Sequence, residues 1–400
     1  MEQPQPTFLL VAGEASGDLH GARLIASLRR RVPAARFFGM GGPLMLAAGL
    51  TPLYDAREVS VMGFVEVLPK LFRILRVLSG LGRWAAANRP AGAVLIDIPD
   101  FNLRLARKLR RLAIPVAYYV APMAWAWRES RVKTLRKLVD RLLCIYPFEE
   151  AWFRERGVRA SFVGNPLLED GHLATPPGRE EARRLLSLDL AAPLVALLPG
   201  SRGSEVSRVL PTMLEAAARV LAARPAVRFV LPVAPSLDRA LLARFVAGSG
   251  LPLTLVEGHA VEVLAAADAT VVCSGTAALE AALAGRPMVV VFRGNPLSHF
   301  IAKLLVRLPD VAMPNILAGR RIVPELIQRE FTAEAVEREL LPLLDGGEAR
   351  DEMLRELARV RRELGGPGAS DRAAGEVLAA LEERGVRLLP APVPATEGAA

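Results

Sequence analysis

A chain of 400 residues is long enough for two domains, and its 52% hydrophobic and 23% charged residues exclude a protein that is disordered overall. The net charge of +9 fits an anionic membrane or phosphorylated substrates as well as nucleic acid, and we expect no nucleic-acid partner. The only cysteines, Cys144 and Cys273, lie in apolar runs and imply neither a disulfide framework nor a cysteine zinc site.

Targeting and metal-binding patterns are also missing from the sequence. The chain does not begin with a basic region followed by an apolar stretch, so we expect no signal peptide and a cytosolic protein. No run of about 18 apolar residues free of charge predicts a membrane-spanning helix. The four histidines are far apart and no Asp-x-Asp occurs, so we expect neither a metal ion nor another cofactor.

The first strand is expected at 7–12, followed by a polar loop at 13–18 and a helix at 19–31. In doubly wound sheets, ligands bind at such loops, outside the carboxyl ends of the strands. The loop lacks a GxGxxG pattern, which argues against dinucleotide binding. Glu14 and Ser16 are therefore candidates to line a ligand site. The alternative is an ordinary turn in which Asp18 caps the helix.

A second strand is expected at 36–40, and the segment 59–82 contains an unusual helix that begins near Pro69. Its basic residues share one narrow face, and its apolar residues cover an arc about twice as wide as a surface helix needs. This pattern is typical of a helix at a membrane interface, and the alternative is a helix buried on two sides. The candidates for contact with the membrane or acyl chains are Met62, Phe64, Val67, Leu68, Leu71, Phe72, Leu75 and Leu78.

Two carboxylates lie at the carboxyl end of the strand expected at 93–98, where catalytic groups of α/β proteins gather. Asp97 or Asp100 could act there as a general base, and the alternative is a pair that caps the loop. Trp125 and Trp127, farther along, could stack on a sugar ring or pack the domain. The other elements expected in this half are helices at 104–112, 131–139 and from Pro147, and strands at 116–120, 142–146 and 161–163.

The polar stretch 168–193, punctuated by proline and glycine, is expected to join two domains. A new strand at 194–198 leads into the loop PGSRGSE at 199–205. Gly200, Ser201 and Arg202 suit a diphosphate, because backbone N–H groups and one permanent cation come together there. The alternative is a solvated arginine. Strands at 228–232 and 253–256 and a helix at 262–267 are expected to follow.

The segment 271–291 is expected to form a strand, a tight loop, a helix and a second strand. Its apolar run stops at Ser274, Gly275 and Thr276, whose small side chains leave backbone N–H groups free for an anion. Glu280 lies one turn farther along the helix and could reach hydroxyls of the molecule that carries the anion. The alternative is an ordinary βαβ unit with a solvated glutamate.

The C-terminal part of the chain is expected to be mainly helical. Asn315 precedes a helical turn, and the helices are expected at 297–306, 332–344, 349–364 and 370–384, before a disordered tail at 386–400. Two successive series of alternating strands and helices predict an α/β protein with two doubly wound domains and a ligand cleft between them. Neither a P-loop nor a GxSxG elbow occurs.

Several blocks carry a resemblance to a known family: AGEASGD (12–18), VMGFVEVLP (61–69), IDIPDFN (96–102), APMAWAWRESRVK (121–133), LLPGSRGSE (197–205), SGTAALEAALAGRPMVV (274–290) and PNILAGR (314–320). From residue 8 to about 380, the chain resembles lipid-A-disaccharide synthase, a family of inverting GT-B-type glycosyltransferases of Gram-negative bacteria. One departure is GNP at 164–166, where the family pattern has GHP. Asn165 can form hydrogen bonds but supplies no imidazole.

The resemblance implies two Rossmann-like domains, at 1–168 for the acceptor and membrane and at 190–362 for the UDP-sugar, with a last helix at 363–385 that crosses back. The donor would be UDP-2,3-diacylglucosamine and the acceptor 2,3-diacylglucosamine 1-phosphate (lipid X). The products would be a β(1→6)-linked disaccharide 1-phosphate and UDP. The enzyme would be peripheral on the anionic cytoplasmic face of the inner membrane, and a homodimer is a further expectation.

The resemblance also implies roles in the reaction itself. Asp97 would remove the proton from the 6-hydroxyl of the acceptor as this oxygen attacks the anomeric carbon of the donor. Arg202 and the helix N-terminus at 274–276 would stabilise the charge that develops on the departing diphosphate.

The remaining candidates would bind substrate, and Glu14 is in addition a candidate catalytic residue beside Asp97 and Arg202. Glu280 would hold the ribose hydroxyls and Asn315 the nucleotide region, while Glu14, Ser16 and Gly17 would line the site from the first domain. One rival is another GT-B-type UDP-sugar transferase or a UDP-sugar 2-epimerase, but an epimerase needs no lipid-binding helix. A second rival is a nucleotide-binding membrane adaptor without catalysis, which would have no need of a base.

Overall fold

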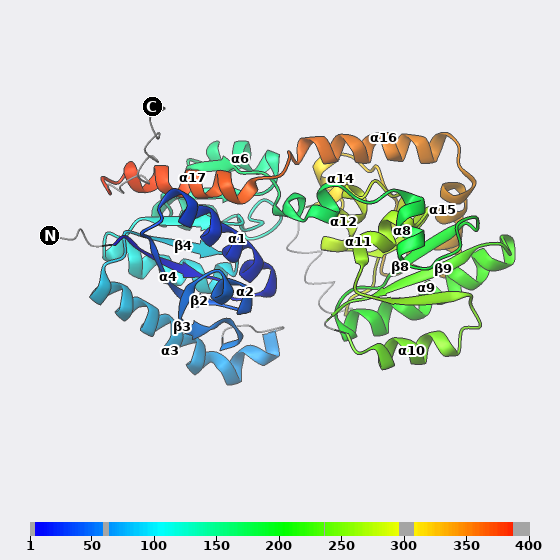
Figure 1. Ribbon diagram of the computed structural model, residues 1–400, viewed down its shortest axis with the longest axis horizontal. Helices are drawn as coiled ribbons and strands as arrows, with labels where there is room; N and C mark the ends of the chain where they lie inside the picture. The colour runs from blue at the N-terminus through cyan, green and yellow to red at the C-terminus, as the bar shows by residue number, and fades with distance from the viewer. Residues whose placement is uncertain (1–4, 59–63, 236, 296–307, 387–400) are drawn as a thin grey trace, which may run out of the picture. The chain divides into compact units, whose positions relative to one another are not determined.

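The computed structural model describes residues 5–58, 64–235, 237–295 and 308–386, which form two compact units (Figure 1). Unit 1 comprises Met1–Pro166 and Pro367–Ala400, and unit 2 comprises Leu167–Gly366. Each unit contains a parallel sheet covered by helices, so the expected α/β class with two Rossmann-like domains is confirmed.

Unit 1 has a seven-stranded parallel sheet with the order β3-β2-β1-β4-β5-β6-β7. The order reverses between β1 and β4, so the carboxyl ends of β1, β4 and β5 are neighbours at the point where such sheets bind ligands. The strands are β1 (Thr7–Val11), β2 (Arg36–Gly41), β3 (Leu50–Asp55), β4 (Gly92–Ile96), β5 (Val116–Tyr119), β6 (Arg141–Cys144) and β7 (Ala160–Phe162).

Helices cover both faces of this sheet, because alternate strand residues point to opposite sides. Leu9 and Val11 join one core with α3 to α6, while Phe8 and Leu10 join a second core with α1, α2 and α17. The helices of unit 1 are α1 (Ala15–Arg31), α2 (Pro43–Ala47), α3 (Phe64–Asn88), α4 (Pro99–Arg111), α5 (Arg131–Leu138), α6 (Pro147–Arg154) and α17 (Ala369–Glu382).

The last helix, α17, belongs to unit 1 although all of unit 2 precedes it in the chain. Figure 1 shows it beside α1, where Arg30 pairs with Asp371 at 2.5 Å. Arg372 Nε also donates to the carbonyl oxygen of Val163 at 2.7 Å. Since Ala373 and Val377 are buried in the core of unit 1, the C-terminal helix completes this sheet's cover.

Unit 2 has a six-stranded parallel sheet with the order β10-β9-β8-β11-β12-β13. Its strands are β8 (Leu194–Leu198), β9 (Arg228–Val233), β10 (Leu253–Glu257), β11 (Ala269–Cys273), β12 (Met288–Phe292) and β13 (Glu325–Ile327). Its helices are α7 (Gly171–Ala174), α8 (Arg179–Leu185), α9 (Gly203–Ala223), α10 (Arg239–Ala247), α11 (Ala260–Ala266), α12 (Thr276–Leu283), α14 (Met313–Ala318), α15 (Ala333–Asp345) and α16 (Glu348–Glu363). The carboxyl ends of β8 and β11 are adjacent.

The stretch 168–193, expected as a joining region, contains α7 and α8, and α8 is fastened to unit 2. Arg183 is fully buried and donates to Asp268 Oδ2 at 2.8 Å. It also donates to four carbonyl oxygens, those of Ala266, Asp189, Leu190 and Ala192. A buried guanidinium is stable only with such a complete set of acceptors.

Two edge strands, β3 and β13, were not predicted. Neither has the unbroken apolar run of a central strand, since β3 contains Pro52 and exposed positions and β13 has only three residues. The helix expected at 297–306 and the tail at 386–400, apart from Val386, lie outside the described residues. Among the described helices, none combines the length and the hydrophobicity needed to cross a bilayer.

The alternative role of Asp18 as the cap of the first helix is wrong. Helix α1 begins at Ala15, with Glu14 at its N-cap position, so Asp18 already lies in the first turn. Its carboxylate instead accepts the backbone N–H groups of Gly42, Leu44 and Met45 at 2.8–3.0 Å. Asp18 thus caps α2, which gives it a purely structural role.

Candidate functional site

Asp97 follows β4 in a backbone conformation that few residues adopt. Its φ is +50° and that of Ile98 is +37°, both in the left-handed region that favours glycine. The Asp97 carbonyl oxygen accepts from Tyr118 Oη at 2.5 Å and from Asn102 Nδ2 at 2.8 Å. Its N–H donates to the Tyr119 carbonyl oxygen at 3.0 Å. Residues held in this way against their backbone preference are concentrated at functional sites.

The Asp97 carboxyl is half-buried, and its environment differs from that of Asp100. Burial raises the pKa of Asp97, and the nearby Glu14 carboxylate raises it further. The exposed Asp100 carboxylate instead pairs with Arg131 at 2.7 Å and with Arg128 at 3.2 Å. Since the Asp100 carboxylate is already paired with two guanidiniums, Asp97 is the better placed of the two to accept a proton.

The first turn of α1 lies beside Asp97, as expected for the loop after β1. Gly17 is buried against Ala12 and Ile96, and a Cβ atom on it would lie 3.3 Å from Ala12 Cβ. The absence of a side chain therefore lets the helix start approach the end of β4. Glu14 and Ser16 are exposed at this helix start, where the backbone N–H groups have no partner within the helix.

The aromatic loop after β5 mostly packs unit 1. The ring of Trp125 meets Phe148 edge-on at 5.0 Å, and its Nε1 donates to Glu149 Oε1 at 2.9 Å. The guanidiniums of Arg128 and Arg131 both pack on the ring of Trp127, at 4.5 and 5.0 Å from its centre. This loop therefore positions the two arginines that bind Asp100.

Glu149, which the sequence did not single out, is a fully buried acid below this loop. Burial raises its pKa to about 7, against the effect of hydrogen bonds from Trp125 and the backbone of Ile145 and Tyr146. It lies at the third position of α6, where a glutamate often caps the helix start. Asn165 is also buried, and its Nδ2 donates to the Ile145 carbonyl oxygen at 3.4 Å.

In unit 2, the loop after β8 brings a carboxylate to the expected diphosphate site. Glu205 Oε2 accepts the N–H groups of Ser201 and Arg202 at 3.3 Å, and Glu205 Oε1 pairs with Arg202 Nη1 at 3.0 Å. Gly200 has a φ of +110°, and a Cβ atom there would lie 2.6 Å from Glu205 Oε2. The sequence identified the arginine but missed the glutamate that orients it.

The loop after β11 lies next to the loop of Arg202, because β8 and β11 are paired. Gly275 has a φ of +146° at the N-cap position of α12, and Ser274 and Thr276 flank it at the surface. Burial raises the pKa of Cys273 to about 12, and the Glu205 carboxylate adds to this shift. The structure thus places Glu205 near both loops, and the two predicted anion-binding segments share one edge of the sheet.

Glu280 lies one helical turn after Thr276, as the spacing predicted. Its pKa is raised by burial and, to a smaller extent, by the carboxylate of Asp170. Asp170 itself caps α7 by accepting the N–H of His172 at 3.0 Å. Glu280 is therefore a half-buried carboxyl beside the start of α12 and is not the solvated glutamate of the alternative interpretation.

Asn315 does not offer its amide to a ligand, contrary to the expected direct role. It is buried, its Oδ1 accepts from Ile322 N and Val323 N, and its Nδ2 donates to Glu325 Oε1 at 2.7 Å. Glu325 also accepts the N–H groups of Val311 and Ala312 at 2.9 Å. Asn315 therefore supports the backbone at 311–312 through Glu325.

This support reaches the predicted anion-binding loop. Ser274 Oγ lies 3.5 Å from the carbonyl oxygen of Val311, to which it donates. The buried Asn315–Glu325 pair can thus act on the loop after β11 only through the position of the chain near Val311. Sequence reasoning found the asparagine in its motif but could not show that its hydrogen bonds are all internal.

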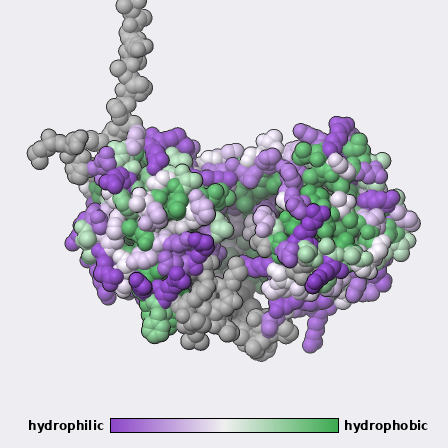
Figure 2. Space-filling model, turned by 60° about the horizontal axis from the view of Figure 1, so that its bottom comes forward, coloured by the Kyte–Doolittle hydropathy of each residue, from purple (hydrophilic) through white to green (hydrophobic). Residues whose placement is uncertain are grey.

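Helix α3 is apolar on two sides, but only one of them is exposed. Phe72 is 85% exposed, Leu71 36% and Leu75 43%, whereas Leu78 is only 6% exposed. Leu78 belongs to the core with Val77 and Leu81, so its assignment to the membrane surface is wrong. Met62 and the side chains of Phe64, Val67 and Leu68 lie outside the described residues. Figure 2 shows hydrophobic side chains interrupting the hydrophilic surface of this unit.

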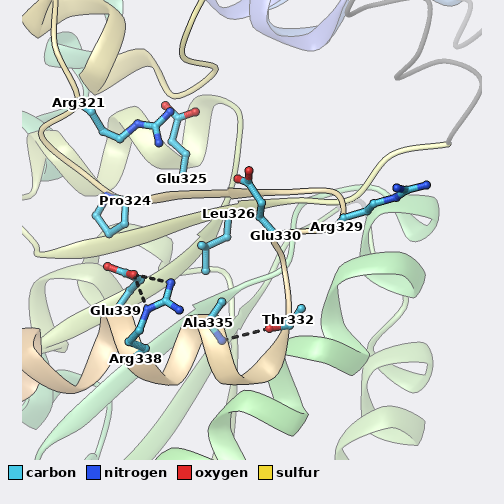
Figure 3. A pocket seen from close by; sticks show the side chains of 10 residues that line it. All are labelled: Arg321, Pro324, Glu325, Leu326, Arg329, Glu330, Thr332, Ala335, Arg338 and Glu339. Carbon is cyan, nitrogen blue, oxygen red and sulfur yellow. Dashed lines mark hydrogen bonds and ion pairs between the residues drawn. The ribbon is translucent and has the colours of Figure 1, made fainter.

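A cavity of about 490 Å³ in unit 2 is lined by Glu325, the partner of Asn315, but by none of the site residues expected from the sequence (Figure 3). Residues of β13, α15 and the connecting turn line it, and its charges are partly paired, Arg338 with Glu339 at 2.9 Å and Arg321 with Asp310 at 2.8 Å. The side chain of Arg329 points away from it. Among the described residues, no three acidic, histidine or cysteine side chains are arranged to hold a metal ion.

Comparisons with known proteins show relatives that match nearly the whole chain. The family described as "Lipid-A-disaccharide synthetase" matches residues 8–374. The lipid-A-disaccharide synthase of Myxococcus xanthus (strain DK1622) is 52% identical, over 94% of this chain and 98% of its own. That of Pseudomonas putida (strain W619) is 45% identical, again over 94% and 98%.

Several solved structures have a fold similar to that of this chain. Acinetobacter baumannii MurG has a TM-score of 0.60 at 16% identity, over 94% of this chain and 100% of that one. The Staphylococcus aureus MnaA–UDP structure has a TM-score of 0.64 at 12% identity, over 94% and 97%. At these identities the structures establish only the architecture that glycosyltransferases and UDP-sugar epimerases share.

Proposed function

The chain belongs to the lipid-A-disaccharide synthase family, and from this premise we propose how its residues carry out the reaction. It is a glycosyltransferase of lipid A synthesis that joins UDP-2,3-diacylglucosamine to 2,3-diacylglucosamine 1-phosphate. The 6-hydroxyl oxygen of the acceptor forms a bond to the anomeric carbon of the donor as the bond to UDP breaks. The products are the disaccharide 1-phosphate, with inverted configuration, and UDP.

Asp97 is the proposed general base. Its carboxyl stands at the carboxyl end of β4, and its raised pKa brings it closer to the pKa at which a base works best near neutral pH. As the acceptor oxygen attacks, the Asp97 carboxylate takes the proton of the acceptor hydroxyl. Asp97 can do this only while its carboxyl is ionised. This observation carries the proposal: the left-handed backbone of Asp97 is fixed by Tyr118 and Asn102, while Asp100 is bound by arginines.

Arg202 and the adjacent helix starts are proposed to receive the departing UDP. The guanidinium that now pairs with Glu205 would bind the diphosphate, together with N–H groups of Gly200 and Ser201 and those at 274–276. Negative charge grows on the diphosphate as the bond to the sugar breaks, so these donors stabilise the transition state more than the bound donor. No metal ion is needed in this scheme.

The other candidates would position substrates. Glu280 would accept hydrogen bonds from the ribose hydroxyls, while Glu14, Ser16 and the N–H of Gly17 would line the sugar site from unit 1. Asn315 would act only indirectly, through Glu325.

Contact with the membrane is proposed for the exposed face of α3. Both substrates carry acyl chains, and Leu71, Phe72 and Leu75 are exposed apolar side chains in the described part of this helix. The basic residues Arg73 and Arg76 on the same helix would favour an anionic surface. This supports a peripheral enzyme on the cytoplasmic face of the inner membrane. A homodimer remains a separate prediction, to be checked by sedimentation.

The variant Asp97→Asn tests the base, with Asp100→Asn as its matched control. Loss of a general base typically lowers the rate about 10²–10⁴-fold, so we expect this fall in kcat for Asp97→Asn with unchanged affinity for UDP. Asp100→Asn should stay within about tenfold of the unchanged enzyme, the usual scale of a lost positioning contact. Released UDP is measured with donor and acceptor both present, because a transferase needs both. Full turnover in Asp97→Asn, or an equal loss in Asp100→Asn, would reject Asp97 as the base.

A further inference from the structure

Unit 1 contains a polar cavity of about 290 Å³ at the edge of the sheet opposite Asp97. Asp140 in its wall directly precedes β6, and Arg159 directly precedes β7. Asp140 Oδ2 accepts the N–H of Val116, the first residue of β5. Asp97 instead follows the carboxyl end of β4. The cavity therefore lies at the amino ends of the parallel strands. Its lining residues are Arg110, Arg136, Lys137, Val139, Asp140, Gly157, Arg159, Glu383 and Arg384.

The two carboxylates of this cavity are already neutralised by arginines. Asp140, whose side chain is only 7% exposed, accepts from Arg110 Nη1 at 3.2 Å and from Arg384 Nε at 2.7 Å. Glu383 pairs with Arg159 at 3.4 Å and also with Arg141, which lies just outside the cavity. The buried carboxylate thus orients two guanidiniums along the wall, so little of their side-chain freedom remains to be lost when a ligand binds.

Two further cations in the wall add charge without a carboxylate to balance it. Arg136 and Lys137 are exposed in the last turn of α5, and within the described part of the chain no ion pair engages either of them. A helix C-terminus favours cations nearby, but its dipole corresponds to only about half a negative charge. The dipole of α5 therefore accounts for less than one of these two positive charges.

The turn that contains Gly157 leaves room for the side chain of Arg136. Gly157 has a φ of +74°, and a Cβ atom at this position would lie 3.1 Å from Arg136 Cδ. Glycine thus permits both the turn after α6 and the close approach of the Arg136 side chain. Four separate segments of unit 1 contribute to the lining, which contains five cations and two anions.

We propose that this basic cavity binds a phosphate group with two negative charges, such as a diphosphate or a phosphate monoester, at a site separate from the one that transfers sugar. Guanidinium groups bind such oxygens in pairs, and Lys137 adds a compact charge. A volume of about 290 Å³ suits a headgroup-sized ligand and is too small for a sugar that carries acyl chains. The source is either a free phosphate compound or the headgroup of an anionic lipid.

Calorimetric titration of the full-length protein with inorganic pyrophosphate tests the site. Saturating UDP is present throughout, so that the proposed donor site is occupied. Lys137→Glu and Arg136→Ser are expected to raise the Kd for pyrophosphate at least about tenfold, because each removes a charge-assisted contact. The control is Lys133→Glu, an exposed lysine on the same helix outside the cavity, which should change the Kd less than about threefold. Thermal unfolding checks that all variants remain folded.

A second arm measures sedimentation with vesicles of phosphatidylcholine that contain phosphatidic acid. Loss of pyrophosphate binding in the two cavity variants supports the site with a free phosphate as ligand. If pyrophosphate does not bind but the two variants bind these vesicles at least about tenfold more weakly than Lys133→Glu does, the site is supported with a lipid headgroup as ligand. If neither measurement separates the cavity variants from Lys133→Glu, the proposal is overturned. Failure here would leave the roles of Asp97 and Arg202 untouched.

Discussion

The exposed face of α3 offers a test in which one helix supplies both the perturbation and its control. The triple variant Leu71→Ser, Phe72→Ser and Leu75→Ser removes three exposed apolar side chains of this helix, of which Phe72 is 85% exposed. Full burial of a phenylalanine or leucine contributes about 1.5–3 kcal/mol, so transfer of the exposed parts of these three into a bilayer contributes about 3 kcal/mol. The variant should therefore bind vesicles about a hundredfold more weakly.

The assay is sedimentation of the protein with vesicles that contain anionic lipid, combined with thermal unfolding in solution. The triple variant should keep the Tm of the unchanged protein, because its side chains are exposed before the change. The control, Leu78→Ala, lies one turn from Leu75 but is buried, so it should lower the free energy of unfolding by about 2–5 kcal/mol and leave vesicle binding of the folded protein intact. Unchanged vesicle binding by the triple variant, or a fall in its Tm like that of Leu78→Ala, would refute the reasoning.

Three acidic residues give further predictions. Glu280→Ala should weaken UDP binding by at least about tenfold, since it removes charge-assisted hydrogen bonds to the ribose; equal affinity in a calorimetric titration would dismiss the assignment. Glu14→Gln should move the acidic limb of the kcat/KM profile to lower pH, because Glu14 raises the pKa of Asp97 and the base works only when ionised; a limb that stays in place would contradict this coupling. Burial raises the pKa of Glu149 from 4.5 to about 7, so the folded state binds the proton more tightly than the unfolded state does. The protein should lose about 3 kcal/mol of stability as pH rises from about 4.5 to about 7. In urea unfolding at several pH values, the free energy of unfolding of Glu149→Gln should fall less between these pH values. An identical fall in the variant would contradict the raised pKa of Glu149.

Much of the architecture could be predicted because its pattern is local. The strands around Leu9 and Val271 are short apolar runs that end at glycine-containing loops, and helices with amphipathic spacing follow them. Such an alternation allows few arrangements other than parallel sheets covered by helices. The placement of Asp97 at the end of a strand followed from the same pattern. The edge strands β3 and β13 were missed because a short, partly exposed strand has no distinctive run of its own.

The partners of individual side chains were decided by residues far away in the chain. The alternative interpretation had Asp18 cap its own helix, but it caps α2, which begins 25 residues later. Asn315 belongs to a family motif, and yet its amide is wholly used by Val323, Glu325 and their neighbours. Glu205 was passed over, although it holds the arginine that the sequence had identified.

Helix α3 shows most clearly what the sequence determined and what the tertiary structure decided. Composition and periodicity determined that it is helical, basic on one side and apolar over an unusually wide arc. Leu75 and Leu78 are equivalent in that pattern, but Leu78 is buried in the core of unit 1 and Leu75 is exposed. The sequence by itself determined most of the helices and strands and much of the chemistry that their loops carry, since these depend on neighbours within a few residues. Only the tertiary structure decided which side chains are buried, paired or free to meet a ligand, because burial and pairing depend on contacts between distant segments.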